Sequence, residues 1–213
     1  MYWRDFLSTY KTIQKEATSK IIDRHSQFLG YTKPTNTEKE AISFLEKIKS
    51  KHWDAKHNAY AYIIQKDNIT RYSDDGEPHG TAGKPILDIL KNNEITNTIV
   101  VVTRYFGGIL LGTGGLVRAY SSAAKLAINN GIIINMTLCV KAVLHCEYNL
   151  YGKVSSILIL LDSKIENSEF LDNVKIIFYI DKNKLNLLDK ELKNISSGNI
   201  KIDILGEEYI KIK

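Results

Sequence analysis

The feature that most constrains this chain is a glycine-rich stretch between an apolar run and a helix-like pattern. Residues 103–120 read TRYFGGILLGTGGLVRAY and hold five glycines and two arginines. The stretch follows the run NTIVVV and leads into SSAAKLAI, which predict a buried strand and then a helix. Glycine inside an element costs about 0.5–1 kcal/mol relative to alanine. So many glycines between a strand and a helix therefore indicate a need for close approach or for exposed backbone amides.

A second glycine-rich segment has the same layout. Residues 73–85, SDDGEPHGTAGKP, precede the helix-like PILDILKNN. Such turns place backbone N–H groups at the positive end of a helix, which favours anion binding, and Thr81 and Thr113 are the expected N-caps. Arginine suits bidentate contacts with phosphate. The residues predicted to bind an anion or RNA are Arg71, Lys84, Arg104, Gly107, Gly108, Gly112, Gly114, Gly115 and Arg118.

Close packing is the alternative explanation, because clustered glycines also let a helix lie against a sheet. Neither segment matches a nucleotide-binding loop. Lys84 is followed by proline, so GTAGKP lacks the spacing of a phosphate-binding loop, and GGILLGTGG lacks the dinucleotide pattern. We therefore expect no tightly bound nucleotide and no cofactor.

The acidic residues of the second segment admit a different interpretation. Asp74, Asp75, Glu77 and His79 are residue types that hold a hard cation or act as general acid and base. Their spacing is not that of an EF-hand, and Asp75-Gly76 is a strong turn signal, so capping of turns and helix ends is favoured. The histidines of KHWDAKH, residues 51–57, are a weak zinc signal. No metal site and no catalytic residue is predicted.

Hydrophobic periodicity predicts an α+β protein of two domains, residues 1–135 and 136–213. The first is expected to begin with a hairpin over residues 10–34 and a helix capped by Asn36 or Thr37. A strand from His57 and a long polar loop over residues 70–85 follow. The strand and helices named above complete the domain, and the last helix is expected to end at Asn130-Gly131. The second has the element order β-α-β-β-α-β, the ferredoxin-like arrangement. We expect it to form a four-stranded antiparallel sheet with two helices on one face.

Charge and cysteine usage narrow the class of protein. The net charge of +5 falls entirely on residues 1–135, which also hold every arginine. Cys139 and Cys146 lie in one strand-like segment and indicate reduced thiols. No apolar run has the length of a membrane span or of a signal-peptide core. We expect a cytoplasmic protein with no membrane partner.

Two long motifs, RYSDDGEPHGTAGKPIL and VVVTRYFGGILLGTGGLVRAY, resemble the signature of the IMPACT/YigZ family. The resemblance covers roughly residues 15–130. It assigns to the family's motif loop the residues Ser73, Asp74, Asp75, Gly76, Glu77, Pro78, Gly80, Thr81 and Gly83. His79 departs from the small residue expected there, so the family pattern assigns it no role.

The resemblance implies a first domain similar to domain IV of elongation factor G and to a domain of a small-subunit ribosomal protein. It implies a second domain similar to a C-terminal domain of the same elongation factor. Eukaryotic members regulate translation through the amino-acid-starvation kinase pathway, by binding a partner protein of that kinase.

The leading hypothesis is a non-enzymatic, translation-linked regulatory protein. It would contact RNA, the ribosome or a ribosome-associated protein through the glycine- and arginine-rich face of the first domain. One alternative is an enzyme acting on a phosphorylated or anionic small molecule between the two glycine-rich loops, and another is a protein–protein adaptor with an exposed apolar patch. Under the leading hypothesis, Arg104→Ala weakens phosphate binding and leaves the fold intact.

Overall fold

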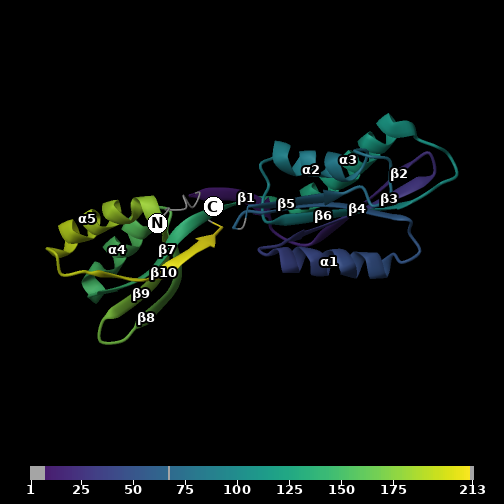
Figure 1. The fold of residues 1–213 in the computed structure, drawn as a ribbon. Coiled ribbons are helices and arrows are strands. Elements are labelled where there is room, and N and C mark those ends of the chain that lie inside the picture. The colour runs from purple at the N-terminus through teal and green to yellow at the C-terminus, as the bar shows by residue number, and fades with distance from the viewer. Residues whose placement is uncertain (1–7, 67, 212–213) are drawn as a thin grey trace. The chain divides into compact units, whose positions relative to one another are not determined.

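The computed structural model describes residues 8–66 and 68–211, and the chain divides into two compact units (Figure 1). One unit spans residues 10–134, and the other joins the described residues from 135 onward with Ser8 and Thr9. Residues 1–7 of the predicted first domain lie outside the described residues. No helix among the described residues has the length and apolarity needed to cross a membrane.

The unit of residues 10–134 is a five-stranded antiparallel sheet with helices on both faces. The strands run in the order β2-β3-β6-β4-β5. Helix α1 covers one face, while α2 and α3 cover the other (Figure 1). The elements are β2 (Ala17–Asp23), β3 (Ser26–Pro34), α1 (Glu38–Lys51), β4 (His57–Ile64), β5 (Ile69–Ser73), α2 (Gly83–Asn92), β6 (Thr98–Tyr105) and α3 (Gly112–Gly131).

The central strand β6 is buried on both faces, as its unbroken apolar sequence predicts. Val100 and Val102 pack with α2 and α3, whereas Ile99 and Val101 pack with α1. Burial of each such side chain stabilises the fold by about 1.5–3 kcal/mol. Because side chains alternate along a strand, Arg104 continues the row toward α3, and Tyr105 continues the row toward α1.

Helix starts differ from the sequence prediction in the two glycine-rich segments. Thr37 caps α1 as expected, accepting the Glu40 N–H. Helix α2 has Ala82 at its N-cap and α3 has Leu111, and neither of these residues caps its helix with its own side chain. The predicted cap Thr81 is wrong because Asp74, from the preceding loop, accepts the first α2 amides instead. The predicted cap Thr113 is wrong because α3 already begins at Gly112.

Three further boundaries are corrected by the structure. The predicted polar loop over residues 70–85 begins with a strand, β5, which pairs at the sheet edge with β4. The hairpin is formed by β2 and β3 alone, since the preceding strand β1 (Thr9–Ile13) joins the other sheet. Helix α3 is capped by Ile132 at positive φ, one residue beyond the predicted Gly131.

The second unit contains the predicted order of elements, β-α-β-β-α-β. Its strands lie in the order β10-β7-β9-β8 with antiparallel neighbours, and β1 also pairs with the long strand β7, which makes the sheet five-stranded rather than four-stranded. Helices α4 and α5 lie together on one face (Figure 1), and both cysteines are buried and free. The elements are β7 (Ile133–Cys146), α4 (Tyr148–Leu160), β8 (Lys164–Phe170), β9 (Val174–Asp181), α5 (Leu185–Ser196) and β10 (Ile202–Ile210).

Candidate functional site

A hollow of about 500 Å³ opens where β6 ends and β4 begins. In the sheet, Arg104 pairs with His57 on one side and with Phe28 on the other, so the strand end carries the arginine to the edge of the unit. We call this hollow the lip hollow. Its lining residues are Asp54, Lys56, His57, Arg104, Tyr105, Phe106 and Leu110.

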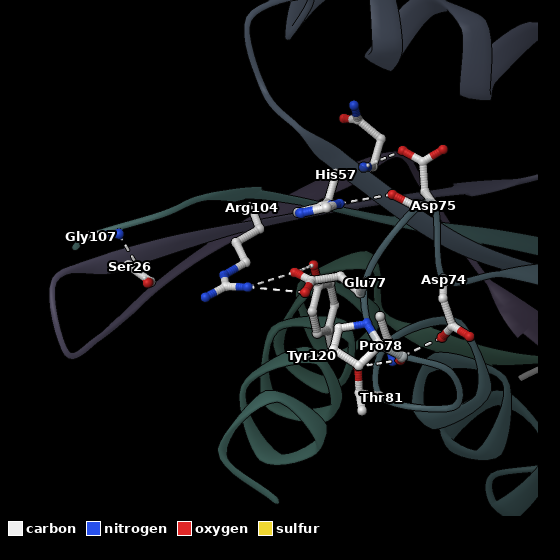
Figure 2. A network of polar contacts seen from close by, with 12 residues as sticks. Ser26, His57, Asp74, Asp75, Glu77, Pro78, Thr81, Arg104, Gly107 and Tyr120 are labelled. Atoms are coloured by element: carbon white, nitrogen blue, oxygen red, sulfur yellow. Dashed lines mark hydrogen bonds and ion pairs between the residues drawn. The ribbon is translucent and has the colours of Figure 1, made fainter. Parts of the chain in front are cut away.

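Arg104 is held in place by a buried ion pair with Glu77 (Figure 2). Its Nη1 donates to both Glu77 carboxylate oxygens, at 2.8 and 3.0 Å, and the Tyr120 hydroxyl donates to the same carboxylate at 2.7 Å. The side chains of Arg104 and Glu77 are only 8% and 2% exposed. Burial, reinforced by the Glu77 carboxylate, raises the pKa of Tyr120 far above its usual range, so the hydroxyl remains a donor.

The ion pair changes what the sequence alone predicts for Arg104. Two of its donor contacts are committed to Glu77, while the opposite end of the guanidinium points away from that carboxylate (Figure 2). The guanidinium also lies over two aromatic rings, 5.6 Å from the Phe28 centroid and 5.5 Å from that of Phe106. Arg104 is therefore a fixed, charge-compensated wall of the lip hollow rather than a freely available anion receptor.

The acidic residues of the motif loop hold the loop itself together. The Asp74 carboxylate accepts the N–H groups of Gly80, Ala82 and Gly83 and so caps α2. The Asp75 carboxylate accepts the Asn58 N–H at 2.7 Å. Both carboxylates therefore serve as acceptors for backbone N–H groups of the loop, the α2 start and β4. The described residues contain no cluster of three or more metal-ligating side chains.

His57 is oriented by the same loop. Its Nδ1 lies 2.8 Å from the Asp75 carbonyl oxygen, which can only accept, so Nδ1 carries the proton (Figure 2). In the tautomer with the proton on Nδ1, the ring nitrogen left to accept a hydrogen bond is Nε2. His79, by contrast, is exposed and does not line the lip hollow.

Two glycines of the segments are required by close backbone approach. A Cβ on Gly107 would lie 2.0 Å from the His25 carbonyl carbon and 2.3 Å from the Ser26 nitrogen, and a Cβ on Gly83 would lie 2.4 Å from the Ser73 carbonyl oxygen. The Gly107 N–H donates to the Ser26 hydroxyl at 3.1 Å (Figure 2). Packing therefore accounts for these positions, and the loop of residues 106–111 is fastened to the β2–β3 hairpin.

The other predicted anion-binding side chains are dispersed. Arg71 lies on the edge strand β5 and approaches Glu38 of α1, on the opposite face of the sheet from Arg104. Lys84 pairs with Asp88 within α2. Arg118 is exposed on α3 and forms no ion pair among the described residues. Of the predicted side chains, only Arg104 lines the lip hollow.

Sequence reasoning missed the turn between α1 and β4. Trp53, in this turn, is 84% exposed. Phe106, which lines the lip hollow, is 55% exposed. Lys56, in the same turn, forms no ion pair with any described residue. The available signal was a tryptophan set among charged residues in KHWDAKH, residues 51–57.

A chain of hydrogen bonds runs from the α1 face of the sheet to the lip hollow. The Tyr105 hydroxyl donates to the Asp54 carboxylate at 2.8 Å, so it accepts from His52 Nδ1 at 2.9 Å. His52 Nε2 is then an acceptor for the Tyr31 hydroxyl at 2.6 Å. This order of donors and acceptors fits the neutral imidazole, which has one N–H and one acceptor nitrogen. Burial lowers the pKa of His52, and the Lys51 charge adds to this effect.

The neutral His52 predicts a pH dependence of stability. Because its folded-state pKa lies below the unfolded value of about 6.5, the unfolded chain binds more protons as pH falls, and the free energy of unfolding decreases. We expect urea midpoints to drop between pH 7.5 and pH 5.5 by more in the wild type than in His52→Gln. Equal drops in the two proteins would contradict this assignment.

Two family models match the chain. The Impact N-terminal domain matches residues 24–128, and a domain of unknown function (DUF1949) matches residues 144–199. The first match contains the whole lip hollow, and the second lies within the unit of residues 135–213.

Individual proteins match over most of the chain. The IMPACT family member YvyE of Bacillus subtilis is 34% identical over 90% of this chain and 89% of that protein. The IMPACT family member YigZ of Escherichia coli is 32% identical over 86% of this chain and 92% of that protein. A solved structure titled "Crystal structure of an hypothetical protein" superposes with a TM-score of 0.60 at 30% identity, covering 95% of this chain and all of the other.

Proposed function

Because the chain belongs to the IMPACT family, as full-length relatives at 32–34% identity establish, we propose that it is a non-enzymatic, translation-linked protein that binds single-stranded RNA at the lip hollow. The family resemblance supplies the link to translation. We also propose that the two units are similar to domains of elongation factor G and that the second unit has the ferredoxin-like arrangement. The chemistry of the site supplies the ligand class.

The observation that carries the proposal is an exposed phenylalanine beside a fixed cation. Phe106 presents more than half of its surface to solvent, and the Arg104 guanidinium supports the ring from 5.5 Å. Proteins bind unpaired bases by stacking them on such rings, and this works with any base. The guanidinium is immobilised by Glu77, so the stacking surface is ordered before a ligand arrives.

Two cationic side chains lie in the lining of the lip hollow or beside the 106–111 loop. Lys56 lines the same hollow, and Arg24 lies at the β2–β3 turn with its Nη1 3.3 Å from the Leu110 carbonyl oxygen of the 106–111 loop. Neither side chain forms an ion pair with a described residue. Phosphates of a short strand crossing the lip hollow would meet these two cations, with Arg118 as a third contact on the adjoining helix.

Binding assays on the full chain test the proposal. With a fluorescein-labelled single-stranded 12-nucleotide RNA, we expect Phe106→Ala to weaken binding about 5- to 100-fold, the range of base–aromatic stacking. Lys56→Ala should weaken binding of every sequence equally and reduce the salt slope by about 1. Lys39→Ala, an exposed lysine at the far end of α1, is the matched control and should bind like the wild type.

The salt dependence provides a second criterion. Three phosphate contacts on a single strand predict a slope of about −2 for log K against log salt. Absence of binding by the wild type at 50 mM salt would refute the proposed function. An equal loss in Lys56→Ala and Lys39→Ala would place the contacts elsewhere on the molecule.

A further inference from the structure

We infer that the lip hollow recognises guanine, with the Asp54 carboxylate reading the base. This inference rests on the proposed RNA binding and names the specificity of that same site. The lip hollow is proposed to bind a polyanion, yet its lining includes the carboxylate of Asp54. Phosphate contacts do not explain a carboxylate in this place.

Asp54 is positioned by a defined series of contacts. The Tyr105 hydroxyl donates to Asp54 Oδ1, and Tyr105 is in turn fixed by His52, which is fixed by Tyr31. Burial, together with the Asp54 carboxylate, raises the pKa of Tyr105 to about 12, so the phenol keeps its proton and the direction of the bond is constant. The Tyr105 hydroxyl thereby orients the Asp54 carboxylate through Oδ1, while the second oxygen has no donor among the described residues.

A carboxylate in this place selects for a ligand that brings hydrogen-bond donors. Asp54 forms no ion pair with a described residue, and it repels phosphate, so a bound strand must offset that repulsion locally. Guanine presents N1–H and N2–H side by side, which matches the two oxygens of a carboxylate. Adenine and cytosine present one amino donor beside a ring acceptor, and uracil presents one N–H between two carbonyls, so none of them forms the paired contact.

The rest of the lip hollow fits a single base. Phe106 and Leu110 contribute apolar side chains to the same lining as Asp54, and Lys56 belongs to that lining as a cation for a flanking phosphate. The volume of about 500 Å³ lies within the range of about 300–1,000 Å³ typical of small-molecule pockets. Stacking on the ring and pairing with the carboxylate then act on the same nucleotide, as in sequence-specific single-stranded RNA recognition.

The test uses the full chain and five labelled heptanucleotides that are uridine throughout except at the central position. That position carries guanosine, adenosine, cytidine, uridine or inosine, which keeps N1–H and lacks the N2 amine. We expect guanosine to bind at least about 5-fold more tightly than adenosine, cytidine or uridine, the discrimination of a bidentate base contact, with inosine intermediate. In Asp54→Asn the preference should vanish while binding of the all-uridine strand is kept or improved.

Two further variants test the positioning of Asp54 and provide a control, namely Tyr105→Phe and Glu46→Gln. Tyr105→Phe frees Asp54 and should lower the guanosine preference without changing binding of the uridine strand, as expected for a positioning residue. Glu46→Gln removes an exposed carboxylate on α1 and should retain the full preference. Equal binding of all five strands by the wild type would overturn the guanine inference and leave RNA binding standing, provided that Phe106→Ala weakens them all. No binding of any strand would refute the proposed function itself.

Discussion

Glu77→Ala is expected to lower the free energy of unfolding by about 3–5 kcal/mol, the cost of leaving one partner of a buried ion pair without the other. In this variant the Arg104 guanidinium would stay buried with no carboxylate, and the Tyr120 hydroxyl would lose its acceptor. Both consequences act in the interior between β6 and α3, where water cannot replace the lost contacts. Urea unfolding at pH 7, followed by circular dichroism, measures the change.

Matched variants separate the charge from the packing. Glu77→Gln keeps the acceptor for Tyr120 and most of the volume, so it should cost less than Glu77→Ala. The double variant Glu77→Leu/Arg104→Met removes both charges and should be more stable than either Glu77→Ala or Arg104→Ala. A loss below about 1 kcal/mol for Glu77→Ala would contradict the structural role of the pair.

The ion pair also revises the expectation drawn from sequence for Arg104→Ala. The sequence alone predicts a variant that folds normally and binds phosphate less well. With Glu77 buried and hydrogen-bonded to Arg104, removal of the arginine leaves an uncompensated carboxylate, so we expect loss of stability together with any loss of binding. For this reason Lys56 and Phe106, not Arg104, are the informative positions for binding assays.

Gly107→Ala is expected to destabilise the protein by about 2–3 kcal/mol, the range of adding an atom where there is no space for it. The added Cβ would lie 2.0 Å from the His25 carbonyl carbon and 2.3 Å from the Ser26 nitrogen. Both are backbone atoms, so rotation of a side chain cannot move them away. The loop of residues 106–111 would have to separate from the β2–β3 hairpin, and the Ser26 contact with the Gly107 N–H would be lost. RNA binding should fall as well, because Phe106 is carried by this loop.

Gly114→Ala is the control from the same segment. In the first turn of α3, a Cβ on Gly114 meets only the end of the Arg118 side chain, at 3.8 Å. Alanine is the better helix former by up to about 1 kcal/mol, so this variant should be as stable as the wild type or more stable. If the two alanine variants unfold at the same urea concentration, the close approach at Gly107 is not what requires glycine there.

Periodicity predicted the parts of the fold that depend on local pattern. The apolar run of β6 predicted a buried strand, and the apolar residues at helical spacing in α3 predicted a helix. The position of Arg104 at the end of the strand followed from the first of these predictions. Strand β5 was missed because its residues are largely polar and none of them is buried. Without a buried face, the sequence of the strand has no strong alternation of apolar and polar residues.

The site was harder to predict because it is assembled by tertiary closure. Glu77 and Arg104 are 27 residues apart, and nothing local to either residue indicates the pairing. The exposure of Trp53 and Phe106 was equally hidden, since an aromatic residue in a sequence is as readily core as surface. The glycines were recognised as significant, yet packing could be distinguished from ligand binding only from the close approaches of Gly107 to His25 and of Gly83 to Ser73.

A map of the RNA contact on the folded protein tests the proposed site most directly. In ¹⁵N-labelled full chain titrated with a single-stranded RNA containing one guanosine, we expect the amide signals of residues 53–57 and 104–111 to shift with the ligand. We expect Phe106→Ala to remove most of this response. Shifts confined to the sheet of the other unit, at residues 139–181, with the signals around the lip hollow unchanged, would contradict the proposed site.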